Sequence, residues 1–392
     1  MEDDRRAVPS LPTPPQVTAQ RPVRVFLPCT GLGRQRRGFE TFTLECADAL
    51  RADPRIALTV FAGGDVPGTP AARARWNLPR DRTLSSLVAP LVRRDRYFVE
   101  QASFFLSFLP ALVTGRPDVV YFADLNLGNL CWHWRRVSGQ RFKLLYYNGG
   151  LTTRPFTRAD MVQQLTPAGL DEALARGESR ARQIVLAHGV RVPDSLPARI
   201  TGDARRTLGL PADRPIVLAV GLLDTHIKRT DALIRAIAEL PAPRPFLALL
   251  GADGLDAATV RTLAHDLLGD DGFVARAVPH DVIGDWYRAA DVFALASLRE
   301  GFGLAYVEAL AHGLPIVAHD TPVTRHLLGG FATLSDITQH AALSHAIAAA
   351  LATPSTEAQR RARHQSARTR FGWDALREEY AQMLLRVAEL AA

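Results

Sequence analysis

Lysine is nearly absent from this chain, which has only Lys143 and Lys228 among its 392 residues. Its positive charge comes from scattered arginines, and the net charge is +7 with a pI near 9.7. An arginine- and alanine-rich, lysine-poor composition is typical of a bacterial, GC-rich genome. No basic stripe interleaved with aromatic residues occurs, so nucleic acid is not an expected partner. No amphipathic basic helix stands out either, so we expect membrane contact to be peripheral at most.

Cysteine and long apolar runs are also scarce. The three cysteines, Cys29, Cys46 and Cys131, are far apart and odd in number, so they form no disulfide framework and have no metal-binding spacing. No run of about 18 or more apolar residues suggests a membrane span. Residues 1–20 lack the apolar segment of a signal peptide, and we expect a disordered tail there. A cytoplasmic protein is the expectation.

What the chain does have is a regular alternation of strand-like apolar runs and helical patterns. Such alternation predicts parallel α/β sheets, and the length suffices for two domains. Helices are expected at 39–50, 97–113, 204–208, 232–239, 305–312, 323–328, 338–352 and 373–390. Strands are expected at 23–27, 56–61, 118–122, 143–147, 184–186, 215–221, 246–251, 273–275, 277–280, 291–297 and 316–318.

The first strand leads into a glycine-rich loop that contains Gly33 and Gly38 and precedes a helical pattern. Strand, loop and helix make the first unit of a doubly wound domain. The glycines allow the backbone to approach a ligand closely, and the helix start favours an anion. The later strands should end near Asp124 and Asn148 at the same cleft. A surface loop, and a simple turn at Asn148, are the alternatives.

Residues 297–322 contain the closest grouping of candidate ligand-binding residues in the sequence. Glu300 opens a turn that includes Phe302 and Gly303, and Glu308 follows inside the next helical segment. A helix entered through a glycine turn offers unpaired N–H groups to a phosphate, whereas carboxylates accept hydroxyl groups. The stretch therefore suits a ligand with anionic and polyhydroxyl parts, such as a nucleotide sugar. The alternative is a capped helix before a buried strand, with both glutamates solvated.

This stretch resembles the Glu-x7-Glu signature of the family-4 retaining glycosyltransferases. The matching residues are Glu300, Gly301, Phe302, Gly303, Glu308, Ala309, Ala311, Gly313 and Pro315. The resemblance extends from Val23 to Leu390 and implies the α/β GT-B fold, in which two Rossmann-like doubly wound domains face an inter-domain cleft. It implies an acceptor-binding domain at 21–195, a donor-binding domain at 196–372 and a helix at 373–392 that crosses back to the first domain.

The resemblance also implies roles for individual residues. Glu308 is expected to accept the ribose hydroxyls, and Glu300 to lie near the transferred sugar. The backbone N–H groups of Phe302, Gly303 and Leu304 are expected beside that sugar. The backbone near Val278 is expected to hold the edge of the nucleotide base.

Lys228 and Arg229 follow the strand at 215–221 and resemble the turn that clamps the donor diphosphate. A compact ammonium suits phosphate oxygens and a leaving group that gains negative charge. Leu222 stands where the family usually has arginine, and Arg229 is expected to supply part of the missing charge. A solvated charge at a helix start is the alternative for Lys228.

The chain also departs from the family in its first domain. Tyr146, Tyr147 and Asn148 stand where many members have a histidine near the reacting sugar, so a histidine-assisted step is not expected. His188 replaces a common asparagine, and we expect a turn residue there rather than a catalyst. The segment from Asn148 resembles a sub-group whose acceptors include sugars and small natural products. No Asp-x-Asp motif occurs, and the resemblance implies catalysis without a metal or other cofactor.

The predicted function is retaining transfer of a sugar from a nucleotide-sugar donor (UDP, GDP or dTDP type) to a hydroxyl acceptor. The acceptor would be a small molecule, a glycan or a lipid-linked molecule in natural-product or cell-envelope glycan biosynthesis. Three alternatives remain open. Glu300 and Glu308 could serve as acid and base of a glycoside hydrolase. The chain could also be a nucleotide-sugar-binding pseudo-enzyme, or an epimerase on the same fold.

Overall fold

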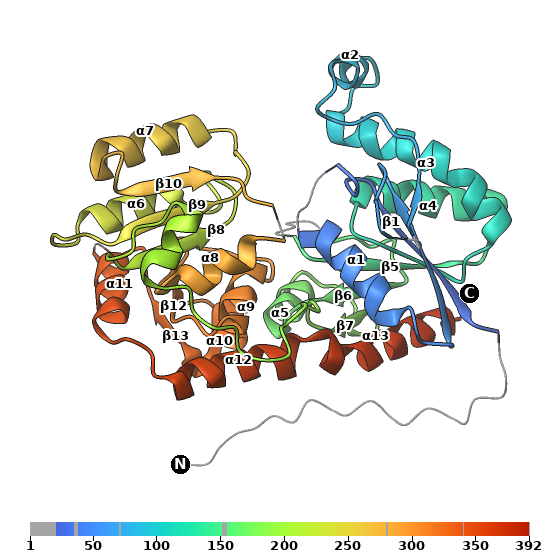
Figure 1. Cartoon of the computed structure of the whole chain (residues 1–392). Coiled ribbons are helices and arrows are strands. Elements are labelled where there is room, and N and C mark those ends of the chain that lie inside the picture. Colours follow the sequence, from blue (N-terminus) through green and yellow to red (C-terminus); the bar gives the residue numbers. More distant parts are fainter. Residues whose placement is uncertain are drawn as a thin grey trace.

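The computed structural model of the chain describes residues 21–34, 38–69, 72–150, 155–279, 281–339 and 341–391. Figure 1 shows two α/β lobes, each with a sheet between helices, and two C-terminal helices that run along the base of both lobes. The tail expected at 1–20 and the strand residue expected at His280 lie outside the described residues.

The first lobe contains a seven-stranded parallel sheet in the order β3-β2-β1-β4-β5-β6-β7. The strands are β1 Val23–Cys29, β2 Ile56–Ala62, β3 Ala72–Ala74, β4 Val119–Phe122, β5 Lys143–Asn148, β6 Met161–Gln164 and β7 Gln183–Val185. The helices are α1 Gly38–Leu50, α2 Thr83–Leu91, α3 Arg96–Gly115, α4 Leu125–Ser138 and α5 Pro167–Ala175, with a 3-10 turn at Arg180–Arg182.

The second lobe contains a six-stranded parallel sheet in the order β10-β9-β8-β11-β12-β13. The strands are β8 Ile216–Val220, β9 Phe246–Leu250, β10 Phe273–Arg276, β11 Val292–Ala294, β12 Ile316–His319 and β13 Ala332–Ser335. The helices are α6 Thr230–Ala238, α7 Ala257–Leu268, α8 Ile283–Ala289, α9 Leu304–Ala311, α10 Pro322–Leu328 and α11 Ala342–Ala352, with 3-10 turns at Gly202–Leu208 and Gly329–Phe331.

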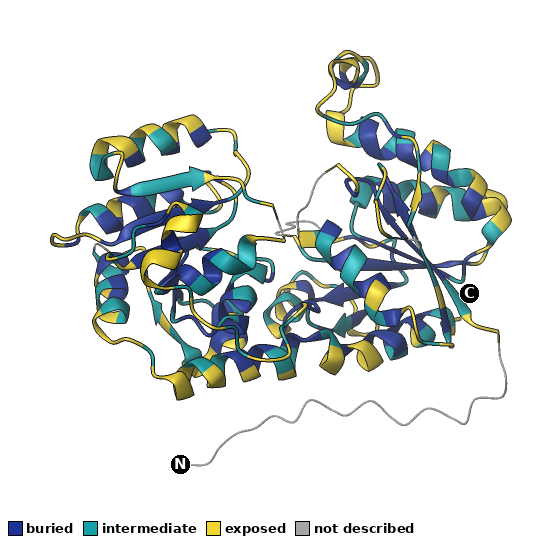
Figure 2. Cartoon of the chain, viewed as in Figure 1, coloured by how far each residue is buried: buried dark blue, intermediate teal, exposed yellow. Residues whose placement is uncertain are grey.

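Both sheets are buried on both faces, as parallel sheets with helical crossovers must be. Figure 2 shows this burial as dark blue central strands in each lobe, whereas the edge strand β10 is teal. Helix α3 has the length and hydropathy of a membrane span. Its residues Phe104, Phe108 and Leu112 are instead buried in a cluster with Phe26 and Phe122 of the first sheet. We therefore describe α3 as a core helix of this lobe.

The last two helices, α12 Glu357–Phe371 and α13 Trp373–Ala388, connect the lobes. Helix α12 packs on α9 of the second lobe, whereas α13 packs on α1, β1, β4 and β5 of the first. The chain crosses between the lobes twice, and the two crossings lie side by side. The N–H of Val190 in one crossing donates to the carbonyl of Phe371 in the other at 2.8 Å. The Tyr380 hydroxyl then donates to the Ala187 carbonyl at 2.7 Å and fixes α13 to the first lobe.

The structure confirms two doubly wound sheets and most of the expected strands. The expectation of a strand at 277–280 is wrong for 277–279, because β10 ends at Arg276 and a loop follows. The helix expected at 204–208 is a 3-10 turn. Strands β3, β6 and β13 were not expected, because each has only three or four residues and short runs carry little periodicity.

Candidate active site

Each sheet reverses its strand order at one point, and such switch points form crevices at the carboxyl ends of the strands. In the first lobe the reversal lies between β1 and β4, where the Thr30 hydroxyl donates to Asp124 Oδ2 at 2.6 Å. In the second lobe it lies between β8 and β11, where Lys228 Nζ donates to Glu300 Oε1 at 2.7 Å. Three of the predicted site residues, Asp124, Lys228 and Glu300, therefore lie where the topology favours ligands.

The loop that presents Lys228 is organised by Asp224. This buried carboxylate accepts backbone N–H groups through Oδ1 from His226 at 2.9 Å, Ile227 at 2.5 Å and Lys228 at 2.9 Å. The stem of Lys228 then lies over Gly221 at the end of β8, where an added Cβ would come within 3.0 Å of Lys228 Cε. The ammonium position thus depends on a hydrogen-bonded loop and on a glycine beneath it.

Glu300 and Lys228 form a largely buried ion pair, with side-chain exposures of 11% and 20%. After Glu300 the chain turns through Gly303, whose φ of +95° lies in the left-handed region, and enters α9. A non-glycine residue is strained in this conformation. The first N–H groups of α9 lack partners within the helix, and they follow directly on the ion pair. The pair and the helix start can therefore face one anionic group.

Glu308 lies one turn further along α9 and is held by a residue from α8. The Tyr287 hydroxyl donates to Glu308 Oε2 at 2.7 Å, and the Tyr287 ring stacks on His312 at 5.0 Å. Burial raises the pKa of Glu308 to about 7, and the charge of Glu45 in the first lobe adds to the rise, while the bond from Tyr287 opposes it. The second oxygen of Glu308 remains to accept hydroxyl groups once the carboxyl is ionised.

This raised pKa predicts how the stability of the protein changes with pH. The folded carboxyl holds its proton up to about pH 7, whereas the unfolded one releases it near 4.5. The contribution of the neutral carboxyl to the free energy of unfolding is therefore fully present below pH 4.5. It is lost as the pH rises to about 7. Glu308→Gln, which stays neutral, should be equal to wild type near pH ~4.5 and more stable by about 1–3 kcal/mol at pH ~8.

Urea denaturation of both proteins across this range measures the effect. Glu389→Gln, an exposed glutamate at the end of α13, is the control and should show no such divergence. A constant difference between Glu308→Gln and wild type at every pH would contradict the prediction.

The first lobe closes over this site at two points. An added Cβ on Gly301 would lie 2.5 Å from the Gly149 carbonyl oxygen, and one on Gly38 would lie 3.9 Å from Leu304 Cδ2. Asn148, at the end of β5, donates to Gln164 Oε1 at 2.8 Å. The structure thus brings the predicted residues Gly38 and Asn148 next to the stretch that begins at Glu300.

Two cavities lie between the lobes. One of about 190 Å³ is lined by Asn148, Gly150 and Thr166 on one side and by Glu300 and Gly301 on the other. The second, of about 720 Å³, is lined by Leu32, Glu40, Glu45 and Asp48 of the first lobe and by Ile283, Tyr287, Glu308 and His312 of the second. Together they define an inter-domain cleft with the two signature glutamates in different parts of it.

The predicted site residues Asp124, Gly33 and Val278 lie away from the ion pair of Lys228 and Glu300. Asp124 accepts from Thr30 and from the Tyr97 hydroxyl within the first lobe. Gly33 has a φ of +87° and packs against the backbone of Gly64 and Asp65. Val278 lies half-buried in the loop after β10.

Arg229, which is expected to supply part of the charge that binds the diphosphate, directly follows Lys228 and is the N-cap residue of α6. It adopts a left-handed conformation, with φ +49°, at the start of α6. Its Nη1 atom is buried and has no hydrogen-bond partner among the described residues. Lys228, in contrast, is hydrogen-bonded to the signature glutamate Glu300.

His188 is a buried core residue at the junction of the lobes. The Tyr147 hydroxyl bonds to its Nδ1, and its ring stacks on Phe302 with a centroid distance of 5.6 Å. Burial lowers its pKa to about 3, so the imidazole is neutral at physiological pH. The expectation of a turn residue is wrong, because His188 lies in a buried segment that forms no turn.

Asp224 and Tyr287 are the residues that sequence reasoning missed. Asp224 had a weak local signal, since Asp in a loop commonly accepts N–H groups two to four residues later. Tyr287 had none, because it pairs with Glu308 on another helix, and the two residues are 21 positions apart in the chain.

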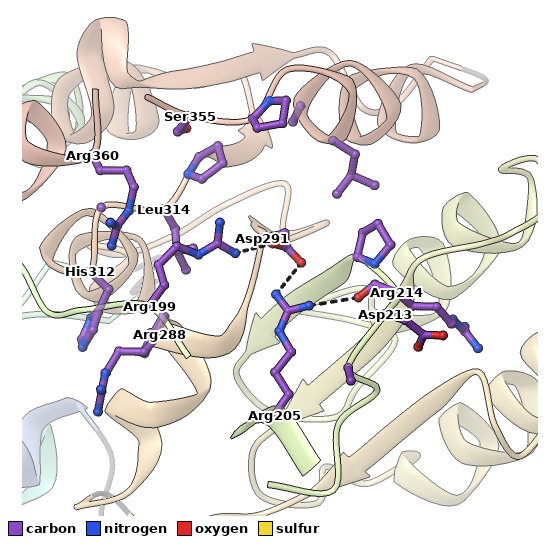
Figure 3. A pocket seen from close by; sticks show the side chains of 18 residues that line it. Arg199, Arg205, Asp213, Arg214, Arg288, Asp291, His312, Leu314, Ser355 and Arg360 are labelled. Atoms are coloured by element: carbon purple, nitrogen blue, oxygen red, sulfur yellow. Dashed lines mark hydrogen bonds and ion pairs between the residues drawn. The ribbon is translucent and has the colours of Figure 1, made fainter. Parts of the chain in front are cut away.

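A further cavity of about 270 Å³, drawn in Figure 3, is lined by residues between Arg199 and Arg360 and is rich in arginine. Arg199 and Arg205 both point at Asp291, and Arg205 also donates to the Arg214 carbonyl at 3.1 Å. These bonds attach the segment between the lobes to the start of β11. The arginines shown thus have a structural function, and we place the candidate site in the cleft.

Comparison with solved structures defines the fold class. The sucrose-phosphate synthase of Thermosynechococcus elongatus aligns with a TM-score of 0.76 and 21% identity, covering 93% of this chain and 99% of that one. Anabaena HepE, in complex with UDP and glucose, aligns with a TM-score of 0.69 and 19% identity over 93% and 100%. The predicted GT-B fold is confirmed.

Sequence comparison shows which family of proteins the second lobe is similar to. Residues 201–369 match the family model described as glycosyl transferases group 1. A D-inositol 3-phosphate glycosyltransferase of Xylanimonas cellulosilytica is 36% identical over 211 residues, which cover 50% of this chain and 48% of that protein. The Mycobacterium tuberculosis protein of the same name is 35% identical over 173 residues, or 38% and 34%. The chain thus matches about half or less of the length of these curated relatives.

Proposed function

We propose that the protein is a retaining glycosyltransferase of family 4 that moves a sugar from a nucleotide-sugar donor to a hydroxyl acceptor. The observation that carries this proposal is the 2.7 Å pair between Lys228 and Glu300 at the switch point of the second sheet. Glu308 lies on the helix that starts beside this pair. A cation, a helix start and two carboxylates suit a diphosphate that is flanked by hydroxyl-bearing rings.

In the proposed complex, Glu308 accepts the ribose hydroxyls while Tyr287 holds its other oxygen. The N–H groups of Phe302, Gly303 and Leu304 and the ammonium of Lys228 bind the diphosphate and the transferred sugar. The backbone near Val278 holds the base edge. Structural neighbours in complex with UDP-glucose, or with ADP and acarbose, support a nucleotide-sugar donor of this kind.

Retention follows if the acceptor attacks on the face from which the phosphate leaves. The acceptor oxygen forms a bond to the anomeric carbon as the bond from that carbon to the diphosphate breaks. The departing phosphate oxygen takes the acceptor proton. The enzyme then has to position the reactants and stabilise the charge that develops on the leaving group, and we assign this stabilisation to Lys228. An inverted product would contradict this route.

The acceptor is proposed to bind from the first lobe, near Gly38, Asn148 and the 190 Å³ cavity beside Glu300. Gly33 and Asp124 would contribute from the β1 and β4 ends of the same lobe. We propose that the reaction needs no metal and takes place in the cytoplasm, on an acceptor that is a small molecule, a glycan or a lipid-linked molecule.

Calorimetric titration with UDP, GDP, dTDP and ADP tests the donor site. One nucleotide should bind in the micromolar range, equally with and without EDTA, and at least about 30-fold more weakly to Glu308→Ala, because ribose hydroxyls lose a charged acceptor. The exposed variant Glu389→Ala is the control and should bind like wild type. Absence of binding by all four nucleotides, or equal binding by Glu308→Ala, would contradict the assignment.

A further inference from the structure

Helix α2 buries small side chains and exposes large apolar ones, which is the reverse of the usual pattern for a surface helix of a globular protein. Its residues Ser85 and Ala89 are buried, at 0% and 5% exposure. Its leucines face outward, with Leu84 at 55%, Leu87 at 62% and Leu91 at 82% exposure. Positions i, i+3 and i+7 share one face of a helix, so these leucines form a continuous apolar ridge.

Two further large apolar side chains close to α2 in the chain are also exposed. Trp76 precedes α2 and is 64% exposed, and Val92 follows the helix and is 47% exposed. In Figure 1, α2 projects from the first lobe beyond α3, and in Figure 2 this projection is largely exposed. Contiguous exposed apolar surface of this kind marks an interaction site. We call residues Trp76, Leu84, Leu87, Leu91 and Val92 the α2 ridge.

Arginines precede and follow α2 in the chain. Residues 72–100 contain seven arginines against Asp81, Asp95 and Glu100, a net charge of +4 in a chain whose total is +7. Arg93 and Arg94 are exposed directly after the helix and have no ion pair among the described residues. Asp95 is engaged in capping α3, because it accepts from the Phe98 N–H at 2.7 Å. The surface around the ridge is therefore open to an anionic partner.

A shallow hollow lies at the foot of the ridge. It has a volume of about 620 Å³ and is lined by Pro90, Arg93, Arg94, Asp95, Phe98 and Asn126. The helix that begins with Arg96 carries Tyr97, whose hydroxyl bonds to Asp124 at the carboxyl end of β4. The ridge and hollow thus adjoin the face of the first lobe that carries the β1 and β4 ends.

We propose that the α2 ridge docks the protein on the surface of an anionic phospholipid bilayer. The leucines and Trp76 enter the interface, and Arg82, Arg93, Arg94 and Arg96 contact lipid phosphates. An apolar helical face with flanking arginines is the pattern of an interfacial helix. The sequence shows no amphipathic basic helix, because the arginines lie just outside α2 and its apolar face is recognised only when the buried face is known.

Vesicle co-sedimentation tests this proposal without any donor or acceptor, so its outcome is independent of the proposed function. Wild type should sediment with vesicles of phosphatidylcholine and phosphatidylglycerol and about tenfold less with phosphatidylcholine alone, because the arginines need anionic lipid. Leu87→Asp/Leu91→Asp should lose binding to both by about tenfold or more. Arg93→Glu/Arg94→Glu should bind both vesicle types equally weakly.

Matched variants control for charge and folding. Val137→Asp changes a residue that is 84% exposed on α4 of the same lobe, and Arg377→Glu/Arg386→Glu reverses two exposed arginines on α13. Both should sediment like wild type, and all variants should melt like wild type because the changed side chains are exposed. The proposal is overturned if wild type binds neither vesicle, if the control variants lose binding equally, or if Leu87→Asp/Leu91→Asp instead dissociates a dimer that ignores lipid.

Discussion

Lys228→Ala is expected to lower kcat about a thousandfold, with a smaller change in the KM for the donor. The ammonium lies 2.7 Å from Glu300 at the start of α9, where the leaving diphosphate would gain charge. Removing one preorganised group that stabilises such charge typically costs about 10²–10³ in kcat. The substitution also leaves Glu300 without its cation in a largely buried place, which adds to the loss. Steady-state kinetics with the donor found by calorimetry measure the effect.

The chain offers a close control for this experiment. Lys143 is the second lysine of the sequence, and its Nζ donates to the Ala391 carbonyl at 2.8 Å, away from the cleft. Lys143→Arg should therefore keep wild-type kinetics. Lys228→Arg should recover only part of the rate, since a planar guanidinium does not reproduce the compact ammonium. A Lys228→Ala enzyme within a few-fold of wild type would remove this lysine from the proposed mechanism.

Gly301→Ala is expected to lower kcat/KM about a hundredfold without unfolding the protein. The new Cβ would lie 2.5 Å from the Gly149 carbonyl oxygen across the cleft. Neither partner is a flexible side chain, so the two lobes must separate by a fraction of an ångström or more. Displacement of reacting groups by about 1 Å can cost about 10² in rate. Activity assays and a melting curve separate this effect from a loss of stability.

Gly330→Ala is the matched control, because an added Cβ there meets nothing within 4 Å. It should leave kcat/KM unchanged. Donor affinity of Gly301→Ala should fall much less than kcat/KM, since Glu308 and Tyr287 both belong to the second lobe. Equal losses in donor affinity and kcat/KM would show that Gly301 acts on the donor site itself rather than on the closure of the lobes.

The signals that could be found in the sequence are all local. The turn from Glu300 to Gly303 and the following helix are visible because glycine placement and helical spacing act over a few residues. The buried strands such as β8 are visible because parallel sheets need continuous apolar runs. Lys228 was conspicuous because the chain has one other lysine. These signals predicted parallel α/β domains, and the resemblance of residues 297–322 to a family signature implied the GT-B fold and the proposed donor residues.

Tertiary structure decided what depends on contacts between distant segments. The pairing of Tyr287 with Glu308, and with it the raised pKa of that carboxyl, requires α8 and α9 to pack together. The approach of Gly301 to Gly149 requires two lobes to meet. The outward ridge of Leu84, Leu87 and Leu91 was hidden because a sequence gives the apolar face of a helix but not which face the fold covers. Burial is a property of the whole packed chain, and no local pattern of residues contains it.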